Sequence, residues 1–277
     1  MELYEDIYSK KFSFGKNWKN FLTKLNDEKI KLAEESLQKF MGVDRLNDKS
    51  FLDFGCGSGL FSLCALNLGA KKVVSVDIDD YSINCAKFLR DKFKISEDKW
   101  IIKKGSALDK KFIQLLGSFD IVYSWGVLHH TGNMWNALEN IIIPTKKDGL
   151  LYIAIYNDFK GFPSSKTWNI IKKVYINSPN IIRFFFRIGL ITQILFFRLI
   201  RLKNPIKYVK YYEKSSTSAR GMDFFRDVED WLGGYPYEYA SSENIVNFYE
   251  NKKNFILINV DKKKGIGCNE FLFKKNV

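Results

Sequence analysis

Three glycines stand directly after an apolar run in the stretch "LDFGCGSGLFS", residues 52–62. Gly55, Gly57 and Gly59 alternate with small residues, and a loop without Cβ atoms lets a ligand lie close to the backbone. A dinucleotide fingerprint would require its third glycine at the position of Leu60, so the pattern argues against a phosphate on the following helix. The loop predicts a ligand site, but not one for a pyrophosphate.

Two carboxylates flank this loop. Asp53 ends the first apolar run, where a carboxylate attracts an ammonium group and repels a pyrophosphate. Asp77 ends the next run, "VVSVD", and its two oxygens can accept hydrogen bonds from two ribose hydroxyls. A cationic nucleoside with an amino acid tail satisfies both carboxylates.

The chain has only two histidines, His129 and His130, which are adjacent and follow the run "FDIVYSW". Histidine titrates near neutral pH and serves as a general base for a hydroxyl or a protonated amine. Neighbouring side chains point in different directions, so we expect one ring toward a substrate and the other toward the backbone. Packing under the following helix is the alternative role for either ring.

Short β-branched or apolar runs alternate with helical patterns from about residue 50 onward, which predicts a parallel sheet covered by helices. The expected fold class is α/β: a Rossmann-like, seven-stranded, mostly parallel sheet with helices on both faces and a helical insertion between strands 5 and 6. The expected strands are 50–54, 72–77, 100–105, 119–125, 149–156, 254–261 and 267–274.

This alternation of strand and helix patterns divides the chain into three parts. Residues 1–49 are expected to form an N-terminal helical cap, and 50–156 with 241–277 the ligand-binding core. The alternation breaks over 157–240, which we interpret as a basic, apolar-rich helical insertion or substrate lid. The last two strands are close enough in sequence to pair as a hairpin.

The formal net charge is +13, from 44 Lys and Arg against 31 Asp and Glu. The basic excess lies mostly in 159–210, which contains eleven Lys or Arg and no acid. This permits an anionic partner without selecting one. The four cysteines show neither zinc-ligand nor disulfide spacing, and the N-terminus lacks the pattern of a secretory signal, so we expect a cytoplasmic protein without a metal.

At these residues the sequence resembles the class I S-adenosylmethionine-dependent methyltransferases, with "FLDFGCGSG", "VDID", "GSALD" and "FDIVYSWGVLHH" as the family's first four motifs in order. The resemblance implies S-adenosyl-L-methionine as cofactor. It places the glycines under the methionine moiety, the ribose at Asp77 and the adenine against Ile78. Ser106 stands where many members have Asp, so that contact passes to the backbone of Ala107. The implied cofactor-binding residues are Asp53, Gly55, Cys56, Gly57, Gly59, Asp77, Ile78, Ser106, Ala107, Trp125 and Gly126.

A narrower resemblance links the chain to bacterial methyltransferases similar to the quinone methylases. It rests on "FGKNW", "GVLHHTGNMW", "YIAIYND" and "RGM…DWLGGYP", which together extend over nearly the whole chain. The sequence contains no Asn-Pro-Pro-Tyr or Pro-Cys run after the fourth strand, as methylation of nucleobases would require. The methyl acceptor is therefore expected to be an oxygen, or an amine on a small molecule.

The stretch "IIRFFFRIGLITQILFFRLIR" would, as a helix, gather four arginines within about 60° of arc, with an apolar remainder. Four arginines disfavour a membrane span. A lid whose apolar face closes on the core is one interpretation, and an anionic membrane surface against 181–210 is the other. The candidate substrate residues are Lys16, Trp18, Tyr156, Arg220, Asp223, Asp227 and Tyr235.

The leading hypothesis is a methyltransferase acting on a small-molecule or lipid- or saccharide-linked acceptor, with His129 or His130 as the base. An RNA methyltransferase is the alternative, although the apolar residues among the basic ones make nucleic acid a poor partner. A non-catalytic, cofactor-binding protein attached to a membrane is the third. The sequence does not indicate an oligomeric state.

Overall fold

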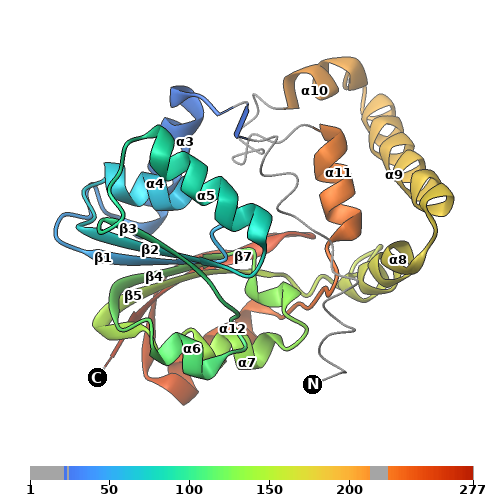
Figure 1. Ribbon diagram of the computed structural model, residues 1–277. Coiled ribbons are helices and arrows are strands. Elements are labelled where there is room, and N and C mark those ends of the chain that lie inside the picture. The colour runs from blue at the N-terminus through green and yellow to red at the C-terminus, as the bar shows by residue number, and fades with distance from the viewer. Residues whose placement is uncertain (1–21, 24, 213–223, 277) are drawn as a thin grey trace.

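The computed structural model describes residues 22–276 except 24 and 213–223. One seven-stranded sheet organises the molecule, in the order β3-β2-β1-β4-β5-β7-β6 (Figure 1). The first five strands are parallel, whereas β7 runs antiparallel to both of its neighbours. The strands are β1 Ser50–Phe54, β2 Lys72–Asp77, β3 Trp100–Lys104, β4 Phe119–Trp125, β5 Thr145–Tyr156, β6 Phe255–Asp261 and β7 Cys268–Lys275.

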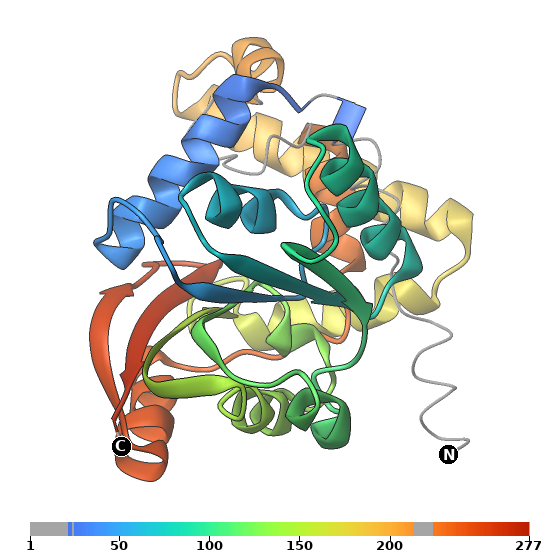
Figure 2. The same cartoon turned by 60° about the vertical axis from the view of Figure 1, so that its left-hand side comes forward.

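Helices cover both faces of this sheet, as Figures 1 and 2 show. One face packs against α3 Asp27–Met41, α4 Leu60–Asn67 and α5 Asp80–Lys92. The other packs against α6 Lys110–Gln114, α7 Met134–Asn140 and α12 Ser242–Lys253. The expected α/β architecture with a doubly covered, mostly parallel sheet is confirmed.

Apolar patterning explains these layers. All five residues of β1 are buried, as in a strand covered on both faces. The amphipathic helix α3 buries Ile30, Ala33, Leu37 and Met41 at spacings of three and four, and Asn26 caps its N-terminus by accepting from the Lys29 N–H.

The described residues between β5 and α12 form four α-helices. They are α8 Ser165–Asn177, α9 Asn180–Ile200, α10 Pro205–Tyr211 and α11 Phe224–Gly233. Trp168, Tyr175, Phe224, Val228 and Leu232 are the buried centre of a separate apolar cluster that joins these helices. The cluster places α11 beside the sheet edge and α9 at the margin of the molecule, beyond α11 (Figure 1).

The helix α9 has apolar residues on both of its sides. None of its residues is fully buried, but Phe186, Leu190 and Ile194 pack inward against the apolar cluster, while other apolar residues face outward. Its arginines face α8, α10 and α11. The interpretation of the insertion as a substrate lid stays a prediction. The arginines find hydrogen-bond acceptors and rings among these neighbouring helices, which explains why the polar stripe turns inward.

Candidate active site

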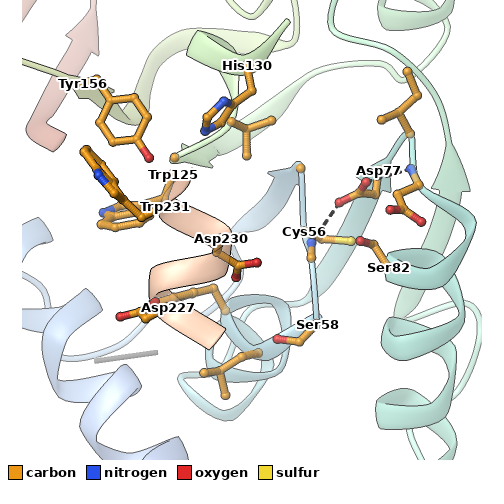
Figure 3. A pocket seen from close by; sticks show the side chains of 18 of the residues that line it. Cys56, Ser58, Asp77, Ser82, Trp125, His130, Tyr156, Asp227, Asp230 and Trp231 are labelled. Carbon is orange, nitrogen blue, oxygen red and sulfur yellow. Dashed lines mark hydrogen bonds between the residues drawn. The ribbon is translucent and has the colours of Figure 1, made fainter. Parts of the chain in front are cut away.

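A cavity of about 830 Å³ lies at the carboxyl ends of β1, β2 and β4, between the sheet and the helices that follow β5. Figure 3 shows Cys56, Asp77 and Ser82 on one side of it and His130 and Trp231 on the other. Ligands of open α/β sheets bind at this edge, where the loops after neighbouring strands meet. The cavity thus joins the glycine loop, the carboxylates and one histidine.

Two glycines of the loop have positive φ and leave no room for a Cβ. Gly55 lines the cavity with φ +81°, and a Cβ there would come within 2.3 Å of the Val127 side chain. Gly59 does not line the cavity: it has φ +81° at the start of α4, where a Cβ would press on Ala86 and Trp100. Gly59 therefore serves the packing of the loop, whereas Gly55, Cys56 and Gly57 form the wall.

Asp53 is held by a buried chain of hydrogen bonds. The Trp100 indole N–H donates to Ser75 Oγ (2.7 Å), Ser75 and Ser62 hydroxyls are 2.6 Å apart, and Ser62 Oγ donates to Asp53 Oδ2 (2.6 Å). Because the indole can only donate, the donors run from Trp100 toward the carboxylate. Burial, with the charge of Asp77 adding to it, raises the pKa of Asp53 to about 7.

Asp77 accepts two backbone hydrogen bonds: Gly57 N donates to Oδ2 (3.0 Å) and Asp79 N to Oδ1 (2.9 Å). These bonds fix the carboxylate at the end of β2 and leave lone pairs on both oxygens for ligand hydroxyls. Burial raises the pKa of Asp77 to about 6. The buried Asp53 and the half-buried Asp77, both with raised pKa values, favour a ligand that brings a positive charge and hydroxyl donors.

The residues expected beside the adenine lie along the same wall. Ile78, Ser106 and Ala107 line the cavity, and the Ser106 hydroxyl accepts from the Leu108 N–H (3.2 Å). Ser106 thus stabilises its own turn, so the backbone of this turn is the part available to a base. Trp125 and Gly126 line the cavity where β4 ends.

The two histidines differ in position. His130 lines the cavity, and its Nδ1 lies 2.7 Å from the carbonyl oxygen of Pro236. His129 is fully buried and is not part of the cavity wall. Its Nδ1 accepts from the Tyr156 N–H (3.3 Å), and its ring lies tilted against that of Tyr156, with 3.9 Å between the ring centres. Of the pair, only His130 has its place at the cavity.

Aromatic and acidic side chains form the other end of the cavity. Trp125 and Tyr156 come from the ends of β4 and β5, and Asp227, Asp230 and Trp231 come from α11 (Figure 3). Tyr156 and Trp231 meet edge to face at 5.7 Å. Rings and carboxylates together suit a cationic group, because ring faces and carboxylates both attract positive charge.

Lys172 of α8 lies behind this wall. It is fully buried, and its ammonium stands 3.9 Å from the Trp231 ring centre and 4.9 Å from that of Tyr237. It also donates to the backbone carbonyl of Trp231. Burial lowers the pKa of Lys172 to about 7, against the opposing charge of Asp230. This lysine ties α8 to the segment that carries Trp231.

The structure thus gathers most of the expected cofactor residues, together with Tyr156, Asp227 and Tyr235, around one cavity. Lys16, Trp18, Arg220 and Asp223 lie outside the described residues. Several wall residues were not predicted from the sequence. Ser58, Phe61, Ser82, Tyr123 and Ile266 come from the core. The others come from the insertion, and their positions depend on how it folds back: Trp168, Leu190, Ile194, Tyr208, Phe224 and Trp231.

The four cysteines are buried free thiols, and the described part of the chain holds no group of three or more His, Cys, Asp or Glu suited to a metal ion. Asp227 is the one candidate substrate carboxylate among the described residues. It accepts a hydrogen bond from the Tyr212 hydroxyl.

Comparison with known proteins gives a partial match over the first half of the core. The family described as ribosomal protein L11 methyltransferase (PrmA) matches residues 31–124. The ribosomal protein L11 methyltransferase of Colwellia psychrerythraea is 46% identical over 56 residues, 20% of this chain and 19% of that protein. The Citrobacter koseri enzyme is 43% identical over 61 residues, 22% and 20% of the two chains. The chain thus matches about a fifth of the length of these relatives.

Solved structures match over a much larger part of the chain. The magnesium protoporphyrin IX methyltransferase of Synechocystis PCC 6803, with bound S-adenosylhomocysteine, has a TM-score of 0.52 at 13% identity and covers 91% of this chain and 89% of its own. An S-adenosylmethionine-dependent methyltransferase structure from Listeria monocytogenes has a TM-score of 0.51 at 12% identity, with coverages of 89% and 99%.

These findings correct one expectation and leave another open. The expected small-molecule or lipid-linked partner is wrong, because the relatives are by name methyltransferases of a ribosomal protein. The narrower resemblance to the quinone-methylase-like group stays a prediction. The expected class agrees with the comparisons: the chain has the fold of the class I S-adenosylmethionine-dependent methyltransferases.

Proposed function

We propose that this chain is an S-adenosylmethionine-dependent methyltransferase that methylates an amine carried by a protein. One observation carries the proposal: a single cavity joins the glycine loop and Asp77 at one end with His130 and the aromatic and acidic wall at the other. We also propose that the enzyme acts in the cytoplasm. RNA methylation has no support among the matched relatives.

The cofactor end fits the chemistry of its ligand. Asp77 offers oxygens to two ribose hydroxyls, and Asp53 supplies negative charge toward a cationic methionine moiety. The glycine loop brings backbone, rather than side chains, against the ligand. When bound, the cofactor supplies an electrophilic methyl group.

The acceptor end positions the nucleophile. Asp227 and Asp230 attract an ammonium group into a chamber walled by Trp125, Tyr156 and Trp231, which favours an amine over the oxygen that the sequence led us to expect. A protein acceptor accords with the names of the relatives. An amine-bearing side chain of the acceptor protein would enter in an extended conformation and place its ammonium group among the aromatic rings.

His130 completes the arrangement as general base. Its Nδ1–H donates to the Pro236 carbonyl, so Nε2 is the nitrogen of the neutral ring that can take a proton from the acceptor ammonium. When the cofactor is bound, the deprotonated amine would be the nucleophile that accepts its methyl group, and the cavity would have to hold the two in line. Trp125 and Gly126 border the position where the two groups meet.

The acceptor class can be tested with methyl-labelled S-adenosylmethionine and an extract of cells that lack this protein. After incubation with the purified chain, the extract is divided and treated with protease, with nuclease or by lipid extraction. We expect the label to become soluble only on protease treatment, and to be absent with a His130→Gln variant. Label removed by nuclease or by lipid extraction would overturn the proposed protein acceptor.

A further inference from the structure

The 21-residue helix α9 presents an uncovered apolar ridge. We define the outer ridge as Ile181, Phe185, Ile188, Phe196 and Leu199, whose exposed fractions are 63%, 64%, 45%, 57% and 58%. Their spacings of four, three, eight and three residues place them on one side of the helix. Contiguous apolar surface of this extent marks an interaction site in a soluble domain.

The outer ridge carries no charge, because the arginines of α9 point the other way. Arg183 donates to two carbonyl oxygens at the end of α8, at 3.1 and 2.6 Å. Arg187 pairs with Glu229 of α11 at 3.0 Å, and the Arg198 guanidinium lies 3.2 Å from the ring centre of Tyr208. These anchors fix which side of α9 is outward.

The anchors also argue against a membrane. Among the described residues, Asn180–Ile200 is the one helix whose length and composition would allow it to cross a bilayer. Crossing would pull three arginines away from these partners and into hydrocarbon, at about 2.5–3.5 kcal/mol each. A helix lying on an anionic surface would gain from cations beside its apolar face, but the three anchored arginines face the protein.

The ridge is self-complementary along its length. Read from its midpoint, between Leu190 and Ile191, the sequence of α9 nearly repeats in reverse: Phe185 mirrors Phe196, and Arg183 mirrors Arg198. Similarly, Ile182 mirrors Leu199, and Phe184 mirrors Phe197. A two-fold interface requires such self-complementarity, since each surface must fit its own copy turned around.

Small residues occupy the middle of this symmetric surface. Gly189 and Thr192 are both exposed, and a Cβ built at Gly189 would have no neighbour within 4 Å. Small residues let two helix backbones approach closely, while the flanking phenylalanines pack over them. Two antiparallel copies of α9 would place Phe185 of each protomer against Phe196 of the other.

We propose that two copies of this chain form a dimer by antiparallel packing of their α9 helices along the outer ridge. The five outer-ridge residues each present on the order of 100 Å² of surface, or roughly 500 Å² per protomer, and the exposed apolar residues Ile182, Phe184, Phe197 and Ile200 add to this at its edges, toward the ~800 Å² that a stable partner buries. The opposite side of α9 contributes Leu190 and Ile194 to the cavity, so the dimer would fix a helix that also walls the candidate active site. The dimer does not depend on the proposed function.

Sedimentation equilibrium of the full chain tests this proposal. We expect a monomer–dimer equilibrium whose Kd rises on the order of 100-fold in Phe185→Lys and in Phe196→Glu, because each change buries a charge twice in the two-fold interface. The double variant should recover the dimer, since the introduced ammonium at 185 then faces the introduced carboxylate at 196 of the other copy. Leu115→Lys is the matched control, because Leu115 is 82% exposed but lies outside the insertion.

Thermal unfolding of each variant verifies that the monomers remain folded. A wild type that stays monomeric at all soluble concentrations, or a dimer indifferent to both single changes, would overturn the proposal. A double variant that remains monomeric would overturn the antiparallel arrangement. Binding of a monomeric wild type to phosphatidylglycerol vesicles, abolished by Phe185→Lys, would replace the second copy by a membrane.

Discussion

The imidazole Nδ1 of His130 lies 2.7 Å from the carbonyl oxygen of Pro236, 106 residues further along the chain. A carbonyl can only accept, so Nδ1 carries the proton in this hydrogen bond and Nε2 is left with a lone pair in the neutral ring. The carbonyl belongs to the segment after α11, which α8 holds through Asn169, whose side-chain amide donates to the Tyr237 carbonyl (2.6 Å). The insertion therefore both walls the acceptor chamber and sets the tautomer of its base.

Replacement of this base should slow the chemical step without loosening the cofactor. We expect His130→Gln to lower kcat by about 10²–10⁴-fold, the usual contribution of a general base, with the Kd for S-adenosylhomocysteine nearly unchanged. Single-turnover kinetics and calorimetry measure the two quantities separately. A variant with wild-type kcat at neutral pH would exclude His130 as the base.

The acidic wall should govern acceptor binding. Asp230→Asn removes a carboxylate that lines the chamber, so we expect the KM for the acceptor to rise about tenfold with a smaller change in kcat. Glu229→Gln is the matched control: it is the neighbouring acid of α11, pairs with Arg187 and does not line the cavity. If the two changes had equal effects on KM, Asp230 would not be a specific contact of the acceptor.

Lys172 should make the insertion pH-sensitive. Its pKa of about 7 in the folded chain lies below the value near 10.4 of an unfolded lysine, so its contribution to the free energy of unfolding is present above pH 10.4 and lost as the pH falls toward 7. Lys172→Met should not show this loss. Urea unfolding at pH 7 and pH 10 should therefore show the variant gaining a few kcal/mol over the wild type at the lower pH. A difference that is the same at both pH values would contradict the buried, charge-disfavouring environment.

The buried carboxylates predict the opposite trend. Asp53 has a pKa of about 7 in the folded chain and about 3.9 when unfolded, so its contribution to stability is present below pH 4 and lost as the pH rises through 7. Between pH 5 and pH 8 the free energy of unfolding of the ligand-free wild type should fall by a few kcal/mol more than that of the Asp53→Asn variant. Cofactor binding should conversely tighten over this interval in the wild type, because the ionised carboxylate attracts the cationic ligand. Parallel pH curves for the two proteins would rule out this role for Asp53.

Much of the cofactor side could be predicted from the sequence because its determinants are local. The β1 run, the glycines and Asp53 follow one another directly, and Asp77 ends the adjacent strand, so parallel pairing of Phe54 with Val76 is enough to bring the carboxylates together. The role of Gly59 could not be predicted from the local sequence. The motif does not reveal that its missing Cβ makes room for Ala86 and Trp100 rather than for a ligand.

The acceptor side depends on long-range packing instead. Lys172, 59 residues before Trp231, donates to the backbone carbonyl of Trp231, and His130 is oriented by Pro236. Periodicity placed the arginines of α9 on one stripe but could not say which side turned inward. That choice depends on acceptors such as Glu229 and the carbonyls that end α8.

Calorimetric titration with S-adenosylhomocysteine measures whether the glycine loop and Asp77 form the cofactor site. We expect one ligand per chain, with a Kd that rises by about 10–100-fold in Asp77→Asn, because the change removes an acceptor for the ribose hydroxyls. Asp80 lies three residues after Asp77 and forms an exposed ion pair with Lys104, so the control variant Asp80→Asn should bind like the wild type. An absence of binding to the wild type, or equal binding by the Asp77→Asn and Asp80→Asn variants, would exclude this cofactor site.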